Sequence, residues 1–144
     1  MGQPDGNGAR GFPESEYPLQ KLTGAIIGAF FETHRTFGYG FLESVYRRAL
    51  AVELTHRGIA IAQEVSYELF HRGVSVGFYR ADLVVGASVV VEAKTGLVPD
   101  PVGPAQLLNY LKAAGLPVGL LLHFGPRPII KRVVAPRSVT MAPR

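Results

Sequence analysis

Residues 80–94 read RADLVVGASVVVEAK and give the strongest indication of the fold. Two aliphatic runs flank the short segment 86–88, a pattern that is typical of antiparallel strands joined by a tight turn. Three charged residues, Asp82, Glu92 and Lys94, interrupt these runs. Because a buried carboxylate without a partner is strongly unfavourable, each of them needs a structural or a functional explanation.

The length of the turn determines whether these charges meet. If residues 86–88 form a three-residue loop, Val85 faces Val89 and Asp82 lies opposite Glu92 on the same face of the sheet. Lys94 shares that face with Glu92, because alternate residues of a strand point the same way. A two-residue loop would send the two acids to opposite faces. The hypothesis of a site therefore depends on the three-residue register.

The pairing of Asp82 with Glu92 favours a cation between the two side chains. Two carboxylates about 5 Å apart repel each other by roughly 3 kcal/mol at an effective dielectric constant near 20, and Lys94 offsets only part of this repulsion. A position lined by carboxylate oxygens suits Mg²⁺ or Mn²⁺, which can activate water and neutralise a phosphodiester. Lys94 would orient that water or stabilise the oxyanion. The alternative is an ordinary ion pair of Lys94 with either acid on a half-exposed sheet.

The rest of the chain divides into helices and strands by the period of its apolar residues. A period of three to four predicts two helices, over 19–38 and 42–58, that form a hairpin, with Gly58 as the left-handed cap of the second. Alternating or continuous apolar runs predict the strands, and a helix precedes the last two. The expected strands cover 59–69, 74–85, 88–94, 118–122 and 129–134, and the third helix covers 105–114. The order ααβββαββ predicts a mixed α/β domain with one crossover helix.

Composition indicates one domain without cysteine chemistry. The 144 residues include no cysteine, which excludes a disulfide scaffold, a thiolate zinc site and a cysteine nucleophile. We expect a disordered leader over 1–18, one domain over 19–135 and a basic flexible tail over 136–144. No secretory signal and no apolar stretch near the roughly 20 residues of a bilayer span is found, so we expect a cytoplasmic protein without membrane contact.

Basic residues are concentrated in the C-terminal part of the chain. Residues 101–144 carry six basic and no acidic side chains, whereas residues 1–100 carry nine basic and eleven acidic ones. This asymmetry favours an anionic partner, with nucleic acid as the leading candidate, because lysine and arginine neutralise phosphates. A solvated surface with a basic tail explains the same charges without a partner.

These residues together resemble a known family. Asp82, followed by Glu92-Ala-Lys94, is similar to the PD-(D/E)XK nuclease superfamily, although Ala81 stands where that motif has proline. Gly40-Phe-Leu-Glu43-Ser-Val-Tyr46 resembles the more specific motif of the GxxExxY proteins, a small branch of that superfamily. The resemblance covers roughly residues 20–134. It implies a restriction-endonuclease-like α/β fold and a nuclease activity on DNA or RNA that depends on Mg²⁺ or Mn²⁺.

The resemblance also implies roles for individual residues. Asp82 and Glu92 would bind the metal ion, Glu43 would complete or assist that site, and Lys94 would position the attacking water. The alternative for Glu43 is stabilisation of the first turn of its helix by the helix dipole.

The helix over 105–114 contributes a second group of residues. Gln106 and Tyr110 match an element that borders the active site in exonuclease-like relatives, and would contact substrate or Lys94. Tyr110 is equally explained by packing against the sheet. His123 stands where the family pattern has asparagine, and we interpret it as a hydrogen-bonded histidine at a strand end.

Three functions stay open at this level. The first is a metal-dependent nuclease. The second is a non-catalytic module that binds nucleic acid or protein on the same fold. The third is a structural or oligomer-forming protein. Homodimerisation is compatible with each of them.

Overall fold

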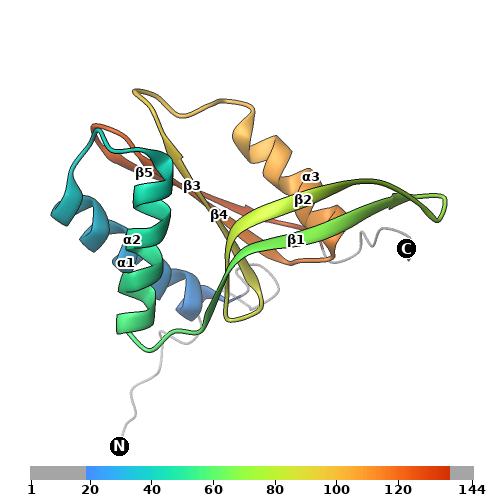
Figure 1. Cartoon of the computed structure of the whole chain (residues 1–144), viewed down its shortest axis with the longest axis horizontal. Helices are drawn as coiled ribbons and strands as arrows, with labels where there is room; N and C mark the ends of the chain where they lie inside the picture. The colour runs from blue at the N-terminus through green and yellow to red at the C-terminus, as the bar shows by residue number, and fades with distance from the viewer. Residues whose placement is uncertain (1–18, 137–144) are drawn as a thin grey trace, which may run out of the picture.

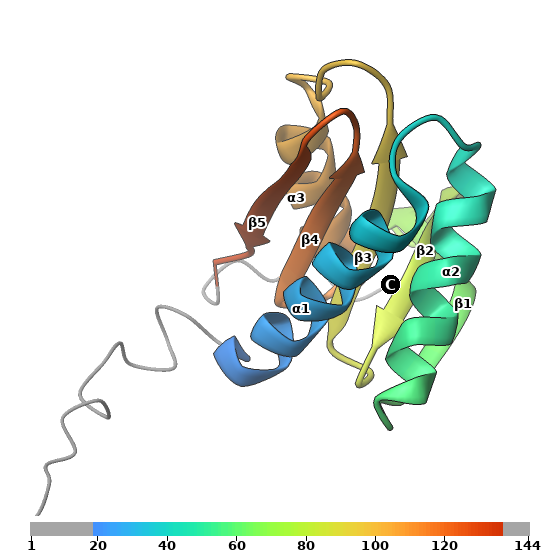
Figure 2. The same cartoon turned by 90° about the vertical axis from the view of Figure 1, so that its left-hand side faces the viewer.

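The computed structural model describes residues 19–136, which form three layers (Figure 1 and Figure 2). Helices α1 (Gln20–Phe37) and α2 (Glu43–His56) lie on one face of a five-stranded sheet, and α3 (Gly103–Ala114) lies on the other. The strands are β1 (Ile61–His71), β2 (Val74–Val85), β3 (Val89–Thr95), β4 (Val118–Phe124) and β5 (Pro128–Val134). The predicted order ααβββαββ and the mixed α/β class are confirmed. The expected leader and nearly all of the expected tail lie outside the described residues.

Local sequence explains the helical hairpin. Buried residues of α1 recur every three or four positions and face the sheet, as at Ile26 and Phe30. After α2, Gly58 has a φ of 78°, and the Ile59 N–H donates to the carbonyl of Leu54. This is the left-handed cap predicted at Gly58, which satisfies carbonyls left free at the helix end.

The sheet has the order β1-β2-β3-β4-β5 and is antiparallel except between β3 and β4. Parallel strands need a crossover connection, which α3 supplies. Every residue of β4 is buried, as expected for a central strand covered on both faces. The edge strand β5 pairs with β4 from Val118↔Val134 to Phe124↔Pro128.

Each face of the sheet has its own apolar core. Under α1 and α2, the ring of Phe124 stacks on Tyr46 at 4.4 Å and meets Phe30 edge-on at 4.8 Å between ring centroids. Under α3, a smaller cluster contains Leu107 and Leu111 of the helix together with residues of β2, β3, β4 and β5. The α3 face is also where Glu92 contacts Tyr79.

The turn between β2 and β3 has the register on which the site depends. Val85 pairs with Val89, Val84 with Val90 and Leu83 with Val91, which confirms the three-residue loop over 86–88. A two-residue loop is thereby excluded.

The ribbon of β1 and β2 turns over at Asp82. Tyr79 and Ala81 belong to the core under α3, whereas Leu83 and Val85 belong to the core under α1 and α2. All four are odd-numbered, so a regular strand would place them on one face. The two faces of the ribbon exchange next to Glu64, which has a φ of 53° and no partner in the regular pairing between Gln63↔Leu83 and Val65↔Ala81. The outer half of the ribbon thus extends away from the sheet and packs on α3 (Figure 1).

Among residues 19–136, no helix has the length and apolar character that crossing a bilayer requires.

Candidate active site

Asp82 lies where β2 separates from β3. The pairing of the two strands ends at Leu83 and Val91. A continued ladder would place Asp82 opposite Glu92 and then Ala81 opposite Ala93, but the Ala93 N–H instead donates to Oδ2 of Asp82 at 2.9 Å. The carboxylate therefore takes the place of a backbone acceptor, and this bond holds Asp82 against β3 beside Glu92.

Glu92 is a buried acid in contact with a second acid. Its side chain is only 8% exposed, the Tyr79 O–H donates to its Oε2, and it lies within hydrogen-bonding contact of Asp82. Burial raises the pKa of Glu92 to about 7, and the negative charge of Asp82 adds to this rise. The Tyr79 hydrogen bond and the positive charge of Lys94 act in the opposite direction. The predicted convergence of the two acids is therefore present.

Tyr79 is a site residue that sequence reasoning missed. Its ring stacks on Tyr110 at 4.2 Å with 7° between the planes, and Tyr67 stacks on its other side at 6.2 Å. Burial, followed by the charge of Glu92, raises the pKa of Tyr79, so its hydroxyl stays protonated and keeps donating. The only sequence feature that pointed to it is its place three residues before Asp82, in a strand where apolar and charged residues alternate.

Lys94 and Glu43 complete the charged cluster. Lys94 is exposed, and its charge lowers the pKa of both Glu43 and Glu92. Partial withdrawal of the Glu43 carboxyl from water raises its pKa overall, with a further rise from Asp82. Glu43 thus lies within the electrostatic reach of the acid pair, although it comes from α2 on the other side of the sheet.

The position of Glu43 depends on the loop before α2. The Tyr46 O–H donates to the carbonyl of Gly38, and the Phe41 N–H donates to the Tyr46 hydroxyl oxygen at 3.2 Å. Tyr46 is fully buried and therefore belongs to the core rather than to the charged cluster. These bonds tie the loop to the helix that begins at Glu43.

A pocket of about 280 Å³ opens beside Glu92, between α3 and the β1–β2 ribbon. Gln106 and Tyr110 line it together with Glu92 and Lys94, so both predicted helix residues border the charged cluster. The ring of Tyr110 stacks on Tyr79, which bears out the packing explanation for this residue.

Two histidines, His123 and His34, contact backbone carbonyls, as expected for a hydrogen-bonded histidine at the position of His123. His123 is 3% exposed, and its Nε2 donates to the carbonyl of Gly96 at 2.9 Å. Its Nδ1 is buried without a hydrogen-bond partner among the described residues. His34, near the end of α1, places Nε2 at 2.8 Å from the carbonyl of Gly125.

The acid pair fits a hydrated Mg²⁺ or Mn²⁺ better than a metal held entirely by protein. Hydrogen bonds from the protein engage Oδ2 of Asp82 and Oε2 of Glu92, which leaves the second oxygen of each carboxylate for a shared proton or a cation. Within residues 19–136, no three Asp, Glu, His or Cys side chains form a metal-binding group. Mg²⁺ needs only one or two carboxylates, because water and substrate phosphates complete its shell, whereas zinc sites have three or four protein ligands.

Comparisons with known proteins bear on the family and on the fold. The family model of the PD-(D/E)XK nuclease superfamily matches residues 20–133. The fold is similar to the crystal structure of SSO0001, with a TM-score of 0.53 and 21% identity over 65% of this chain and 50% of that one. An alkaline exonuclease (LHK-Exo) from Laribacter hongkongensis gives a TM-score of 0.48 and 13% identity over 64% and 55%. The chain spans about half the length of these two proteins. None of the curated proteins matches the chain significantly.

Proposed function

Because the chain belongs to the PD-(D/E)XK nuclease superfamily, we propose that it is a metal-dependent nuclease that hydrolyses phosphodiester bonds of DNA or RNA. The observation that carries the proposal is the acid pair Asp82 and Glu92, held in contact with each other beside Lys94. Such a pair disfavours its own ionised state, and a cation removes that cost.

Asp82 and Glu92 are the proposed ligands, and Glu43 assists from the start of α2. When bound, Mg²⁺ or Mn²⁺ supplies Lewis-acid chemistry, which lowers the pKa of water and neutralises phosphate charge. The Ala93 N–H and the Tyr79 O–H orient the two carboxylates, so that little reorganisation is needed on loading.

Lys94 is the residue proposed to contact the reacting water and phosphate. Its ammonium group donates hydrogen bonds only, so it can orient the attacking water or stabilise the charge that develops on the phosphate oxygens. Gln106, across the pocket on α3, contacts the substrate in this proposal, and Tyr110 supports Tyr79.

Nucleic acid is the proposed partner because of the charge distribution. The basic side chains of residues 101–144 include Lys131, which lies on the same side of the sheet as Lys94. The finer assignment to the GxxExxY branch rests on Gly40, Glu43 and Tyr46 and stays a prediction, as do the cytoplasmic location and a homodimer.

Cleavage of labelled single- and double-stranded DNA and RNA, with Mn²⁺ or Mg²⁺ and with EDTA, tests the proposal. We expect cleavage only with metal, and a loss of about 100-fold or more in Lys94→Ala and Asp82→Asn, since one stabilising group is commonly worth that much. Lys21→Ala, an exposed lysine on α1, is the matched control and should cleave normally. Circular dichroism checks folding. If nucleic acid is bound but not cleaved, and its affinity does not change with metal or with the Asp82 and Lys94 substitutions, the protein would instead be a non-catalytic binding module.

A further inference from the structure

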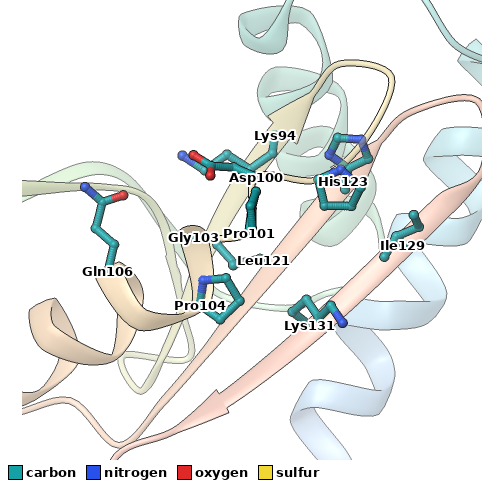
Figure 3. A pocket seen from close by; sticks show the side chains of 11 residues that line it. Lys94, Asp100, Pro101, Gly103, Pro104, Gln106, Leu121, His123, Ile129 and Lys131 are labelled. Carbon is teal, nitrogen blue, oxygen red and sulfur yellow. The ribbon is translucent and has the colours of Figure 1, made fainter.

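A second and larger pocket of about 380 Å³ adjoins the acid pair (Figure 3). Its wall includes Lys94, Gln106 and Leu121, which also line the pocket beside Glu92, so the two hollows meet at these residues. It lies on the α3 side of the sheet, between β4, β5 and the start of α3 (Figure 3). None of the functions argued above uses this space.

Strands form one side of this pocket and a proline-rich loop forms the other. His123 on β4 is the register partner of Lys94 on β3 and of Ile129 on β5, so the three side chains lie in one row across the sheet. The opposite wall contains three prolines, which are Pro99, Pro101 and Pro104. Proline has a fixed φ, so this wall is rigid before any ligand binds.

The lining is apolar in the middle and cationic at two sides, with one carboxylate, Asp100, on the proline-rich loop, where its Oδ1 accepts from the Val102 N–H. Leu121, Ile129 and the prolines offer flat or branched apolar surface, while Lys94 and Lys131 stand at different sides of the hollow (Figure 3). A free phosphate or sulfate would gain nothing from the apolar part. A ligand that combines an apolar ring with a phosphate matches both parts.

His123 provides an unused hydrogen-bond acceptor at this wall. Its Nε2 donates to the carbonyl of Gly96, so the neutral ring carries its lone pair on Nδ1. That atom is buried and has no partner within residues 19–136. The Nε2 edge is packed against Gly125, where an added Cβ would come within 2.7 Å of Nε2. Because this nitrogen only accepts, any group that reaches it from the pocket must carry a hydrogen-bond donor, such as the ring N–H of a nucleobase.

We propose that this pocket accepts one unpaired nucleobase of a single-stranded substrate, next to the phosphodiester at Lys94. The proposal rests on the proposed nuclease function and adds the substrate class. The volume lies at the lower end of the roughly 300–1,000 Å³ of small-molecule sites, which suits a single nucleoside. Gln106 and His123 face the edge of the base, and Lys131 neutralises a neighbouring phosphate. Bases within a duplex are stacked and must leave the helix to enter such a pocket.

A binding experiment without metal tests this assignment. Fluorescence anisotropy in EDTA compares a labelled strand of ten thymidylates with a ten-unit abasic strand that keeps the phosphates and lacks the bases. The variants are Ile129→Trp and the smaller Ile129→Phe, which fill the pocket from β5. Val52→Trp is the matched control, since Val52 is 70% exposed on α2 and borders a separate groove. The chain has no tryptophan of its own, so the new indole emission reports whether each Trp variant is folded and whether the indole at position 129 is buried.

We expect the wild type and Val52→Trp to bind the thymidylate strand about tenfold more tightly than the abasic strand, and the Ile129 variants to lose most of this difference. Equal affinity of the wild type for both strands overturns the base pocket. So does a base preference that survives in both Ile129 variants, because the bases would then bind elsewhere. The binding experiment is done in EDTA, where no cleavage is expected. Equal binding of the two strands would therefore leave the cleavage test of Lys94 unaffected. Conversely, an inactive protein in the cleavage test would still give an interpretable binding result.

Discussion

The contact between Glu92 and Asp82 is the residue-level feature that most constrains the chemistry. With burial and the neighbouring charge raising the pKa of Glu92 to about 7, the pair carries a proton for much of the neutral range when no cation is present. Tyr79 keeps Glu92 in place in either protonation state. A divalent cation would displace the proton, so pH and metal concentration should act on the same two carboxylates.

Metal-free stability should fall as pH rises through neutrality. The pKa of Glu92 is about 7 in the folded protein and near 4.5 in the unfolded chain, so the folded state binds more protons between these values. The resulting stabilisation is complete below pH 4.5 and lost above pH 7, and amounts to about 3 kcal/mol at most. Urea unfolding in EDTA between pH 4.5 and 8 measures it. Glu92→Gln cannot ionise and should be less sensitive to pH; parallel profiles of the two proteins would contradict the assignment.

Removing the Tyr79 hydroxyl should weaken the site without removing the aromatic stack. In Tyr79→Phe, Glu92 loses a buried donor while the ring still covers Tyr110. We expect the free energy of unfolding to fall by about 1–3 kcal/mol at pH 8, the cost of leaving a buried acceptor without its partner. Chemical denaturation measures this loss. Tyr67→Phe, on the other side of the stack, is the control, and an equal loss in both variants would show that the Glu92 bond is unimportant.

Among the elements, the fit of α3 on the sheet determines where Gln106 and Tyr110 stand. Gly119 of β4 faces the helix, and a Cβ at that position would come within 2.7 Å of the Leu107 side chain. The close approach of helix and strand therefore depends on the absence of a side chain at this point. The outer half of the β1–β2 ribbon depends on the same helix, because it packs against α3.

Gly119→Ala should displace α3 and reduce both stability and activity. Overpacking a well-filled core costs about 1–3 kcal/mol, and a shifted helix moves Gln106 away from Lys94. Thermal unfolding and the cleavage assay measure the two effects. Gly24→Ala is the control, since nothing lies within 4 Å of a Cβ there on the exposed side of α1, and it should be neutral or stabilising by up to about 1 kcal/mol. Stability of Gly119→Ala equal to wild type would show that Leu107 adapts without moving the helix.

At the scale of the whole molecule, charge is divided between segments that the fold brings together. The acid pair comes from β2 and β3, whereas Lys131 comes from the part of the chain that has only basic charges. The sheet places β4 beside β3 and β5 beside β4, so Lys131 lines the same pocket as Lys94, the neighbour of the acid pair. In the proposed nuclease, the basic segment would hold the polyanion beside the acid pair.

Nucleic-acid binding should weaken steeply with salt, and Lys131 should contribute to that dependence. Each phosphate contact on a single strand adds about −0.7 to the slope of log affinity against log salt. Lys131→Ala should lower the magnitude of the slope by about this amount, whereas Lys21→Ala, on α1 across the sheet, should leave it unchanged. Anisotropy titrations at about 50 to 200 mM NaCl measure the slopes, because affinities for nucleic acid change strongly over this salt range. An unchanged slope in Lys131→Ala would remove this residue from the phosphate contacts.

The order of the elements and their approximate bounds could be predicted from the sequence, whereas the choice between a two-residue and a three-residue loop before Val89 was settled by the observed register. Each of these depends on nearby residues: apolar period, Gly caps and the short loop between two aliphatic runs. The charged residues could be identified for the same reason, since Asp82, Glu92 and Lys94 interrupt otherwise apolar strands.

The reversal of the two faces of the β1–β2 ribbon at Asp82, and with it the surroundings of Glu92, follows from tertiary packing. Ala81 and Leu83 have the same parity and both are buried, yet they face opposite cores. The alternation of apolar and polar residues in the sequence is the same whether or not the ribbon exchanges its two faces. The choice depends on α3 offering an apolar surface to the outer half, an interaction between residues about 30 positions apart, as in the stack of Tyr79 on Tyr110. Such long-range packing leaves no local signal, and it is what delivers the Tyr79 hydroxyl to Glu92.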